Sequence, residues 1–138
     1  GEYAAVIPKW IKSFINNEDV FINGDGETTR DFCFIDNVIK ANILACLTEE
    51  EEAFGNIFNI ACNKQTSLLE LFNLLKEKLA VEQPGILEIK PQFKDFLSGD
   101  IRHSLADISK AKKLLLYEPE QYISEGLDQS LDWYLSNS

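Results

Sequence analysis

The chain has 138 residues, of which 45% are hydrophobic and 26% are charged, a composition typical of one globular domain with its own core. Its formal net charge of −10 excludes a nucleic-acid surface, which needs clustered cations, and it disfavours binding to anionic membranes. No apolar run approaches the length of a membrane span, and no basic leader with an apolar stretch is present. Because the chain contains no methionine, we expect it to be either a processed product or, in preference, a piece of a longer protein.

Three cysteines are widely spaced along the chain: Cys33, Cys46 and Cys62. All three lie inside apolar patterns, and no close group of cysteine and histidine has the spacing of a zinc site. We interpret them as buried free thiols of a cytoplasmic protein, because disulfides belong to oxidising compartments. The sequence therefore predicts no metal site.

The first predicted helix covers residues 5–16, where apolar residues recur at helical spacing. A short strand over residues 20–22 leads into the turn Asn23–Gly26, in which glycine allows a positive φ. Arg30 leaves this turn and enters a predicted aromatic strand, and Asp36 is the predicted N-cap of the next helix.

That second predicted helix, residues 36–48, is apolar almost all round. A helix of this kind is normally buried on more than one side. Two arrangements would achieve this: a central position in this domain, or docking onto a neighbouring domain that the sequence does not contain.

The middle of the chain predicts two strands and a helix. Residues 56–61 form a buried strand, and Ser67 with Glu70 forms a capping box that opens a helix reaching about residue 79. Pro84-Gly85 breaks the chain before a second predicted strand over residues 86–89.

Residues 91–99 are expected to be irregular, and two helices complete the chain. A short basic helix starts at Asp107 or Ser109, and an amphipathic helix covers residues 123–135. The alternation of helices and short strands favours an α/β arrangement of residues 1–138 in a single domain.

The only arginines are Arg30 and Arg102, against eleven lysines, and each follows a Gly-Asp element. Two guanidinium groups that converge on one diphosphate would explain this placement, because the arginine fork matches phosphate oxygens. Two local ion pairs, Arg30 with Asp31 and Arg102 with Asp100, would explain it equally well.

His103 and Phe21 each allow a functional and a purely structural interpretation. His103 is the only histidine; a general base is conceivable, but no triad is visible, so we interpret it as a loop histidine with one hydrogen bond. Phe21 could stack on a planar base beside the glycine turn or pack in the core. Neither a Gly-x-Gly-x-x-Gly turn nor a Tyr-x-x-x-Lys pair occurs, so the residues predict no dinucleotide site.

Three segments, residues 4–10, 22–36 and 99–109, carry a specific resemblance. With their Gly24-Asp25-Gly26…Arg30-Asp31-Phe32 and Arg102-His103-Ser104 motifs, they resemble the C-terminal half of extended short-chain dehydrogenase/reductases. The resemblance is strongest to the bacterial UDP-N-acetylglucosamine 4-epimerases of surface-polysaccharide pathways, and it spans nearly the whole chain.

The resemblance implies a longer enzyme with an N-terminal Rossmann domain that binds NAD. Such an enzyme oxidises C4 of the sugar by hydride transfer to NAD, lets the 4-keto sugar rotate, and returns the hydride to the other face. The glycine fingerprint and the Tyr-x-x-x-Lys pair of that family lie before Gly1. We therefore expect the chain alone to bind no cofactor, to contain no catalytic residue and to have no epimerase activity.

By position, the resemblance also implies roles for individual residues. Ala5 and Val6 meet the nucleotide, and Phe21 lines the uracil. Arg30 binds the diphosphate, and Ser104 lies near the hexose and its N-acetyl group.

One position departs from the family. The family usually carries a second phosphate-binding arginine two residues before Gly-Asp, where this chain has Leu97. Leucine forms no charge-assisted hydrogen bond, a loss of roughly 1.5–3 kcal/mol or about ten- to a hundredfold in affinity. Arg102, in the same predicted substrate-binding segment as Asp100, or Lys94 could replace it; alternatively, the enzyme is weak or divergent.

Three functions remain open from the sequence. The first is the substrate-binding portion of a cytoplasmic, homodimeric 4-epimerase that interconverts UDP-GlcNAc and UDP-GalNAc. The second is the same portion of a UDP- or dTDP-sugar dehydratase or decarboxylase. The third is a non-catalytic interaction module that pairs through the apolar helix over residues 36–48.

Overall fold

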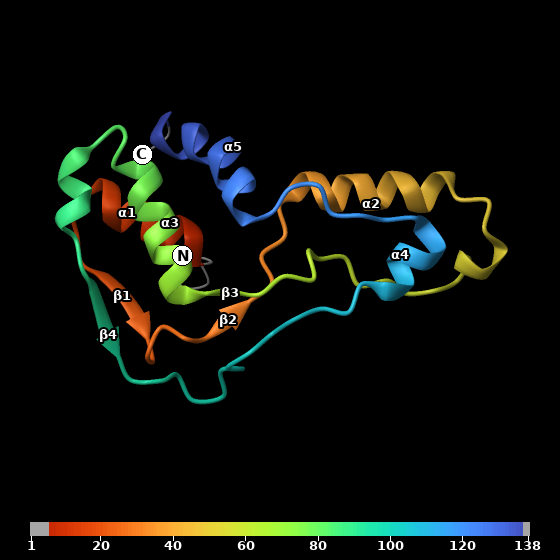
Figure 1. Cartoon of the computed structure of the whole chain (residues 1–138), viewed down its shortest axis with the longest axis horizontal. Helices are drawn as coiled ribbons and strands as arrows, with labels where there is room; N and C mark the ends of the chain where they lie inside the picture. Colours follow the sequence, from red (N-terminus) through yellow and green to blue (C-terminus); the bar gives the residue numbers. More distant parts are fainter. Residues whose placement is uncertain (1–5, 137–138) are drawn as a thin grey trace. The chain divides into compact units, whose positions relative to one another are not determined.

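The computed structural model describes residues 6–136 of the chain. These residues form two compact units, which are described one at a time. The first contains the chain up to Thr28, Ser67–Arg102 and the chain from Leu127; the second contains Thr29–Thr66 and His103–Gly126. Helices and short strands alternate along the chain (Figure 1). This mixture confirms the predicted α/β class, whereas one domain over residues 1–138 stays a prediction.

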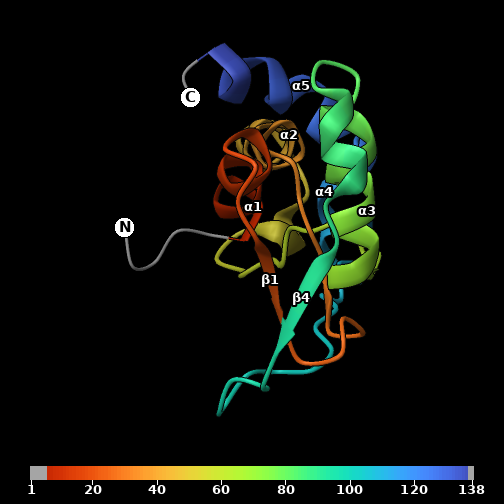
Figure 2. The ribbon, with the colours of Figure 1, turned by 90° about the vertical axis from the view of Figure 1, so that its left-hand side faces the viewer.

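The first unit is built on two helices and a pair of strands. α1 (Val6–Ile15) contacts α3 (Leu68–Leu79), and β1 (Val20–Asn23) pairs in parallel with β4 (Pro91–Lys94). Figure 2 shows β4 lying along β1. The C-terminal helix α5 (Ile123–Ser136) begins in the second unit and ends in the first.

The apolar stripes predicted for α1 and α3 form the core of this unit. Phe72 of α3 lies against two aromatic rings of α1, at centroid distances of 6.3 Å from Trp10 and 5.1 Å from Phe14. The buried residues of α1, β1 and α3 are Trp10, Ile11, Phe14, Val20, Ile22, Leu71, Phe72, Leu75 and Leu79. The Ser67 hydroxyl accepts the N–H of Glu70 at 3.1 Å, which confirms the predicted cap of α3.

Two predictions in this unit are wrong. The predicted strand over residues 86–89 belongs largely to a 3-10 helix, η2 (Pro84–Glu88), and the predicted irregular segment 91–99 begins with β4. Ile86 is buried and η2 contacts α3, so the apolar pattern here reflects packing onto a helix. β4 has no alternating apolar pattern; it forms because β1 supplies its backbone partners, and proline is tolerated as the first residue of a strand.

The second unit is built around α2 (Ile35–Leu47) and α4 (Ser109–Leu115), which contact each other. It also contains the 3-10 helix η1 (Glu51–Ala53) and β2 (Thr29–Arg30), which pairs with β3 (Thr66–Ser67). The buried core cluster of this unit consists of Ala41, Ala53, Ala61, Ile108, Ala111, Leu115 and Tyr117. Because most of these side chains are alanines, the core buries little apolar area per residue.

Three predictions in the second unit also need correction. Residues 56–61 are not a strand; in this segment the carbonyl of Ile57 accepts Lys110 Nζ at 3.2 Å. The predicted aromatic strand after Arg30 does not form: residues 31–34 are not in a strand, and the strand found here is β2, Thr29–Arg30, which precedes them. Asp36 is not the N-cap; Phe34 is, without a side-chain cap bond, and Asp36 lies in the first turn of α2, where its charge complements the helix dipole.

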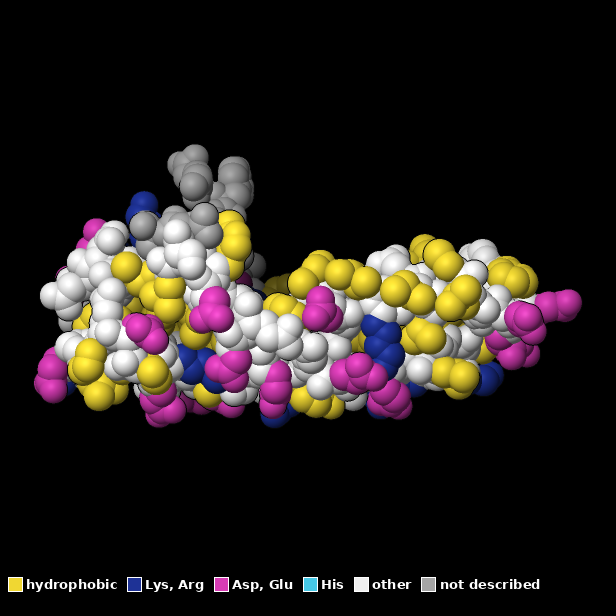
Figure 3. Space-filling view, turned by 90° about the horizontal axis from the view of Figure 1, so that it is seen from above, with side chains coloured by type: hydrophobic (Ala, Val, Ile, Leu, Met, Phe, Trp, Pro, Cys, Tyr) yellow, Lys and Arg dark blue, Asp and Glu magenta, His cyan; other side chains and the backbone are white. Residues whose placement is uncertain are grey.

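α2 is less buried than its composition predicts. Its buried residues are Asn37 and Ala41. Four large aliphatic side chains at four-residue spacing, which we call the α2 stripe, are each between 49% and 73% exposed: Ile35, Ile39, Ile43 and Leu47. Hydrophobic side chains gather over α2 in Figure 3. Among residues 6–136, no helix combines the length and apolarity needed to cross a membrane.

Candidate functional site

The glycine turn after β1 is held from two sides within the first unit. Gly24 and Gly26 have φ values of +82° and +87°, as their sequence context predicts. The N–H of Gly24 donates to Lys94 O of β4 at 2.8 Å. The carbonyl of Gly26 accepts the N–H of Leu69, in the first turn of α3, at 3.0 Å. The turn is therefore fixed to both a strand and a helix end.

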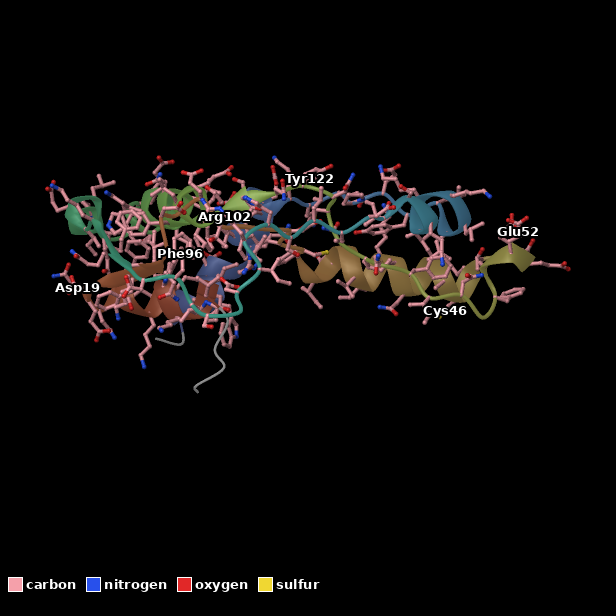
Figure 4. The ribbon with its side chains drawn as sticks, turned by 90° about the horizontal axis from the view of Figure 1, so that it is seen from below. Asp19, Cys46, Glu52, Phe96, Arg102 and Tyr122 are labelled. Atoms are coloured by element: carbon pink, nitrogen blue, oxygen red, sulfur yellow. The ribbon has the colours of Figure 1, made fainter. Side chains whose placement is uncertain are left out.

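Phe96 packs directly on this turn. A Cβ added to Gly24 would lie 2.4 Å from Phe96 Cε1, so only glycine leaves room for the ring. On the Phe96 ring lies Arg102, whose Cζ is 5.3 Å from the ring centroid. Figure 4 shows Phe96 and Arg102 as neighbours.

Alanine at Gly24 is expected to lower the melting temperature more than alanine at Gly99. Both glycines have a positive φ, so each substitution strains the backbone by about 1–2 kcal/mol. At Gly24 the new methyl group must also displace the Phe96 ring, whereas nothing lies within 4 Å of a Cβ at Gly99. Thermal unfolding followed by circular dichroism measures both effects.

Gly85→Ala is the neutral control for this pair, because Gly85 has open space around it and no positive φ. Equal losses for Gly24→Ala and Gly99→Ala would show that the contact between Phe96 and the turn contributes nothing to stability.

Arg102 is paired with the turn itself. Its Nη2 lies 2.6 Å from Asp25 Oδ2, and both side chains are about half exposed. The Arg102 guanidinium, together with the N–H of Glu27, holds the pKa of Asp25 below its ordinary value of 3.8, so Asp25 is ionised at neutral pH. The ion pair that the structure gives Arg102 is thus with Asp25, 77 residues away, rather than the predicted one with Asp100.

Phe21 and Lys94 face each other across the strand pair. Lys94 Nζ lies 3.5 Å from the centroid of the Phe21 ring, a close cation–π contact. The Phe21 side chain is 40% exposed, so core packing, one of the two interpretations of this residue, is excluded.

A shallow depression of about 730 Å³ lies beside these residues in the first unit. Its lining consists of Asn23, Phe93, Lys94, Asp95, Phe96 and Leu97. Leu97, the position at which the resemblance implies an arginine, is therefore part of the lining. Lys94 is the only cation among these six residues.

In the second unit, Arg30 and Ser104 meet at the backbone of Thr29. The carbonyl of Thr29 accepts Arg30 Nη1 at 2.8 Å and the N–H of Ser104 at 3.2 Å. The hydroxyl of Thr29 lies 3.1 Å from His103 Nδ1. This contact confirms the interpretation of His103 as an exposed loop histidine with a hydrogen bond.

The chain behind Arg30 is anchored by a polar cluster that the sequence did not reveal. The Asp31 carboxylate accepts the N–H groups of Cys62, at 3.0 Å, and of Ala106, at 3.4 Å. Buried Asn37 accepts the N–H groups of Glu120 and Gln121 at 2.9 and 3.2 Å and donates to Gln121 O at 2.6 Å. These bonds join residues 31–37 to Cys62, to Ala106 and to residues 120–121 of the second unit.

Cys33, Cys62 and Tyr117 of this unit are not activated as nucleophiles, because the pKa of each is raised. Burial raises the pKa of Cys62 to about 12, and it also raises the pKa values of Cys33 and Tyr117. All three cysteines are free, as predicted, but Cys46 is exposed and Cys33 half-buried, so only Cys62 fits the prediction of burial. In the part of the chain that the structure describes, no group of histidine, cysteine and acidic residues could hold a metal ion.

The remaining predicted site residues lie in the first unit or outside the described range. Val6 is the first residue of α1 and is half-buried, and Asp100 is exposed. Ala5 lies outside the described residues. Phe21 and Arg102 therefore belong with Val6 and Asp100 to the first unit, and Arg30 and Ser104 to the second.

Comparisons with known proteins bear on both units. The model of the "NAD dependent epimerase/dehydratase family" matches residues 1–61. The solved UDP-N-acetylglucosamine 4-epimerase of Methanobrevibacter ruminantium M1, in complex with UDP-N-acetylmuramic acid, is 33% identical, with a TM-score of 0.85 over 100% of this chain and 41% of that chain.

Two further proteins widen the range of activities. The solved UDP-glucuronic acid 4-epimerase of Bacillus cereus, in complex with UDP-glucuronic acid and NAD, is 30% identical, with a TM-score of 0.83 over 99% of this chain and 41% of that chain. A UDP-N-acetyl-α-D-glucosaminuronate decarboxylase of Bacillus cytotoxicus is 27% identical over 97% of this chain and 41% of its own length. The chain thus spans about two fifths of the length of the proteins that it matches.

Proposed function

Because the chain belongs to the NAD-dependent epimerase/dehydratase family, we propose that it is the UDP-sugar-binding portion of a nucleotide-sugar 4-epimerase. The similarity to solved epimerases with UDP-sugars bound supports this proposal. The structural observation that carries it is the arrangement of Arg30 and Ser104 on one carbonyl, that of Thr29.

Each residue that we propose to contact the UDP-sugar has a chemical role. The Arg30 guanidinium presents a planar fork of donors to the diphosphate, and the Ser104 hydroxyl can donate to or accept from a hydroxyl or acetamido group of the hexose. Phe21 offers a half-exposed ring for the uracil. We further propose UDP-GlcNAc and UDP-GalNAc as the substrate pair, and a cytoplasmic homodimer as the assembly. Val6, Asp100 and Arg102 are proposed as further residues of the substrate-binding segments.

The residues of this chain do not fit NAD. No strand, glycine-rich turn and helix with the Gly-x-Gly-x-x-Gly spacing follow one another in residues 6–136. We therefore derive no hydride-transfer step from these residues, and we assign them to binding and orienting the UDP-sugar. The 4-epimerase activity is proposed for the longer enzyme alone.

Calorimetric titration of the 138-residue chain tests this proposal. We expect weak heats of binding with UDP and with UDP-GlcNAc, none with NAD, and no conversion of UDP-GlcNAc to UDP-GalNAc. Absence of any heat with UDP and UDP-GlcNAc at millimolar ligand would refute the proposed binding role.

A second candidate function follows from the exposed α2 stripe. Four large aliphatic side chains on one helix face form the kind of patch that marks a protein–protein contact. In this alternative the chain is a non-catalytic interaction module, and the UDP titration separates the two because a module of this kind gives no heat. A sugar dehydratase or decarboxylase remains the third candidate, supported by the decarboxylase relative.

A further inference from the structure

Two cations in the first unit could meet the phosphates of a bound nucleotide, and they differ in their surroundings. Arg102 forms an ion pair with Asp25 at 2.6 Å and lies on the Phe96 ring. Because the pKa of Asp25 is lowered, this carboxylate stays ionised and neutralises Arg102 across the neutral pH range. An anionic ligand would have to compete with Asp25 for the guanidinium.

Lys94 is not held in an ion pair of this kind within residues 6–136, although the neighbouring Asp95 lines the same depression. Within residues 6–136, no carboxylate oxygen lies within 4.0 Å of Lys94 Nζ, and its contact is with the Phe21 ring. The ammonium group also stands at the depression that contains Leu97. In a chain with a net charge of −10, Lys94 is the one cation among the residues that line this depression, so it is the lining residue that can attract an anion.

The strand register fixes where Lys94 stands. β1 and β4 pair Asn23 with Lys94, and the N–H of Gly24 bonds to Lys94 O, so the residue is held at the start of the glycine turn. Its side chain reaches back over Phe21, the ring that we assign to the uracil. A phosphate attached to a nucleoside at that ring therefore comes within the reach of a lysine side chain.

On the premise of the proposed UDP-sugar function, we propose that Lys94 binds a phosphate of the nucleotide, while Arg102 is a positioning residue. Lys94 supplies the charge that Leu97 cannot supply. Arg102 ties the glycine turn, through Asp25, to the segment that carries Phe96 and so maintains the wall of the depression. The proposed ligand of Lys94 is therefore the diphosphate group of a nucleoside diphosphate.

Calorimetry of the 138-residue chain with UDP and with uridine tests the role of Lys94. Lys94→Gln is expected to weaken UDP binding about tenfold or more and to leave uridine binding within about twofold, because uridine has no phosphate. Lys94→Arg is expected to keep most of the UDP affinity. The matched control is Lys90→Gln, at an exposed lysine just before β4, which should leave both affinities unchanged.

Three results would overturn the assignment of Lys94. Equal weakening of UDP and uridine would show that Lys94 only supports the Phe21 ring. Unchanged UDP binding in Lys94→Gln, with wild-type binding intact, would refute the phosphate contact and leave the proposed function standing. No UDP binding by the wild-type chain would refute the proposed function and this inference together.

Discussion

Arg30→Ala is expected to weaken UDP binding to the chain by about ten- to a hundredfold. The substitution removes a charge-assisted hydrogen bond to phosphate, and bonds of this kind contribute about 1.5–3 kcal/mol. Arg30 is already oriented in the free chain, because its Nη1 donates to Thr29 O at 2.8 Å. Little ordering of the side chain therefore opposes binding. Isothermal calorimetry with UDP measures the affinity.

Arg30→Lys is the informative control. It keeps the positive charge but loses the planar fork, so its affinity should fall between those of the wild type and Arg30→Ala. Circular dichroism of all three proteins verifies that the fold is retained. Identical UDP heats for the wild type and Arg30→Ala would remove Arg30 from the proposed site.

Asn37→Ala is expected to lower the free energy of unfolding by about 2–5 kcal/mol, a large fraction of the stability of a small domain. The Asn37 amide serves two N–H groups and one carbonyl, all on Glu120 and Gln121. Alanine leaves each of these backbone groups without that partner. Each group that water does not reach then costs about 1–3 kcal/mol of stability. Urea unfolding followed by circular dichroism measures the difference.

Asn42→Ala is the matched control on the same helix. The Asn42 side chain is exposed and donates only to Val38 O, one turn earlier, at 2.9 Å. Its loss should change the free energy of unfolding by no more than about 0.5 kcal/mol. Equal effects at the two positions would show that the buried amide of Asn37 is not a structural link.

The helices of this protein can be predicted from residues that are close together in the sequence. α1, α3 and α5 each carry an apolar stripe of helical period, and Ser67 caps α3 through a bond to a residue three positions later. The positive φ of Gly24 and Gly26 is equally local, because glycine adopts that backbone at little cost. All of these features were predictable without knowledge of tertiary contacts.

The strands and polar contacts that shape the candidate site depend on distant residues. β4 exists because β1 pairs with it, and the bond from Arg102 to Asp25 spans 77 positions. The amide of Asn37 reaches residues 83 and 84 positions away. A single sequence contains no signal for such pairings. Motifs could therefore name the site residues, but they could not show that, among the residues that the structure describes, Arg102 is in an ion pair and Lys94 is not.

The parallel pairing of β1 with β4 bears on the order of events during folding. Residues 24–90 separate the two strands, so their contact has a high sequence separation and its loop closure is entropically costly. On the ribosome, Phe21 and the glycine turn emerge early, but their partner strand arrives only after most of the chain has been made. The strand pair that carries Lys94 therefore forms late. A chain that stops before residue 91 contains the turn motif but lacks β4 and most of the residues that line the depression.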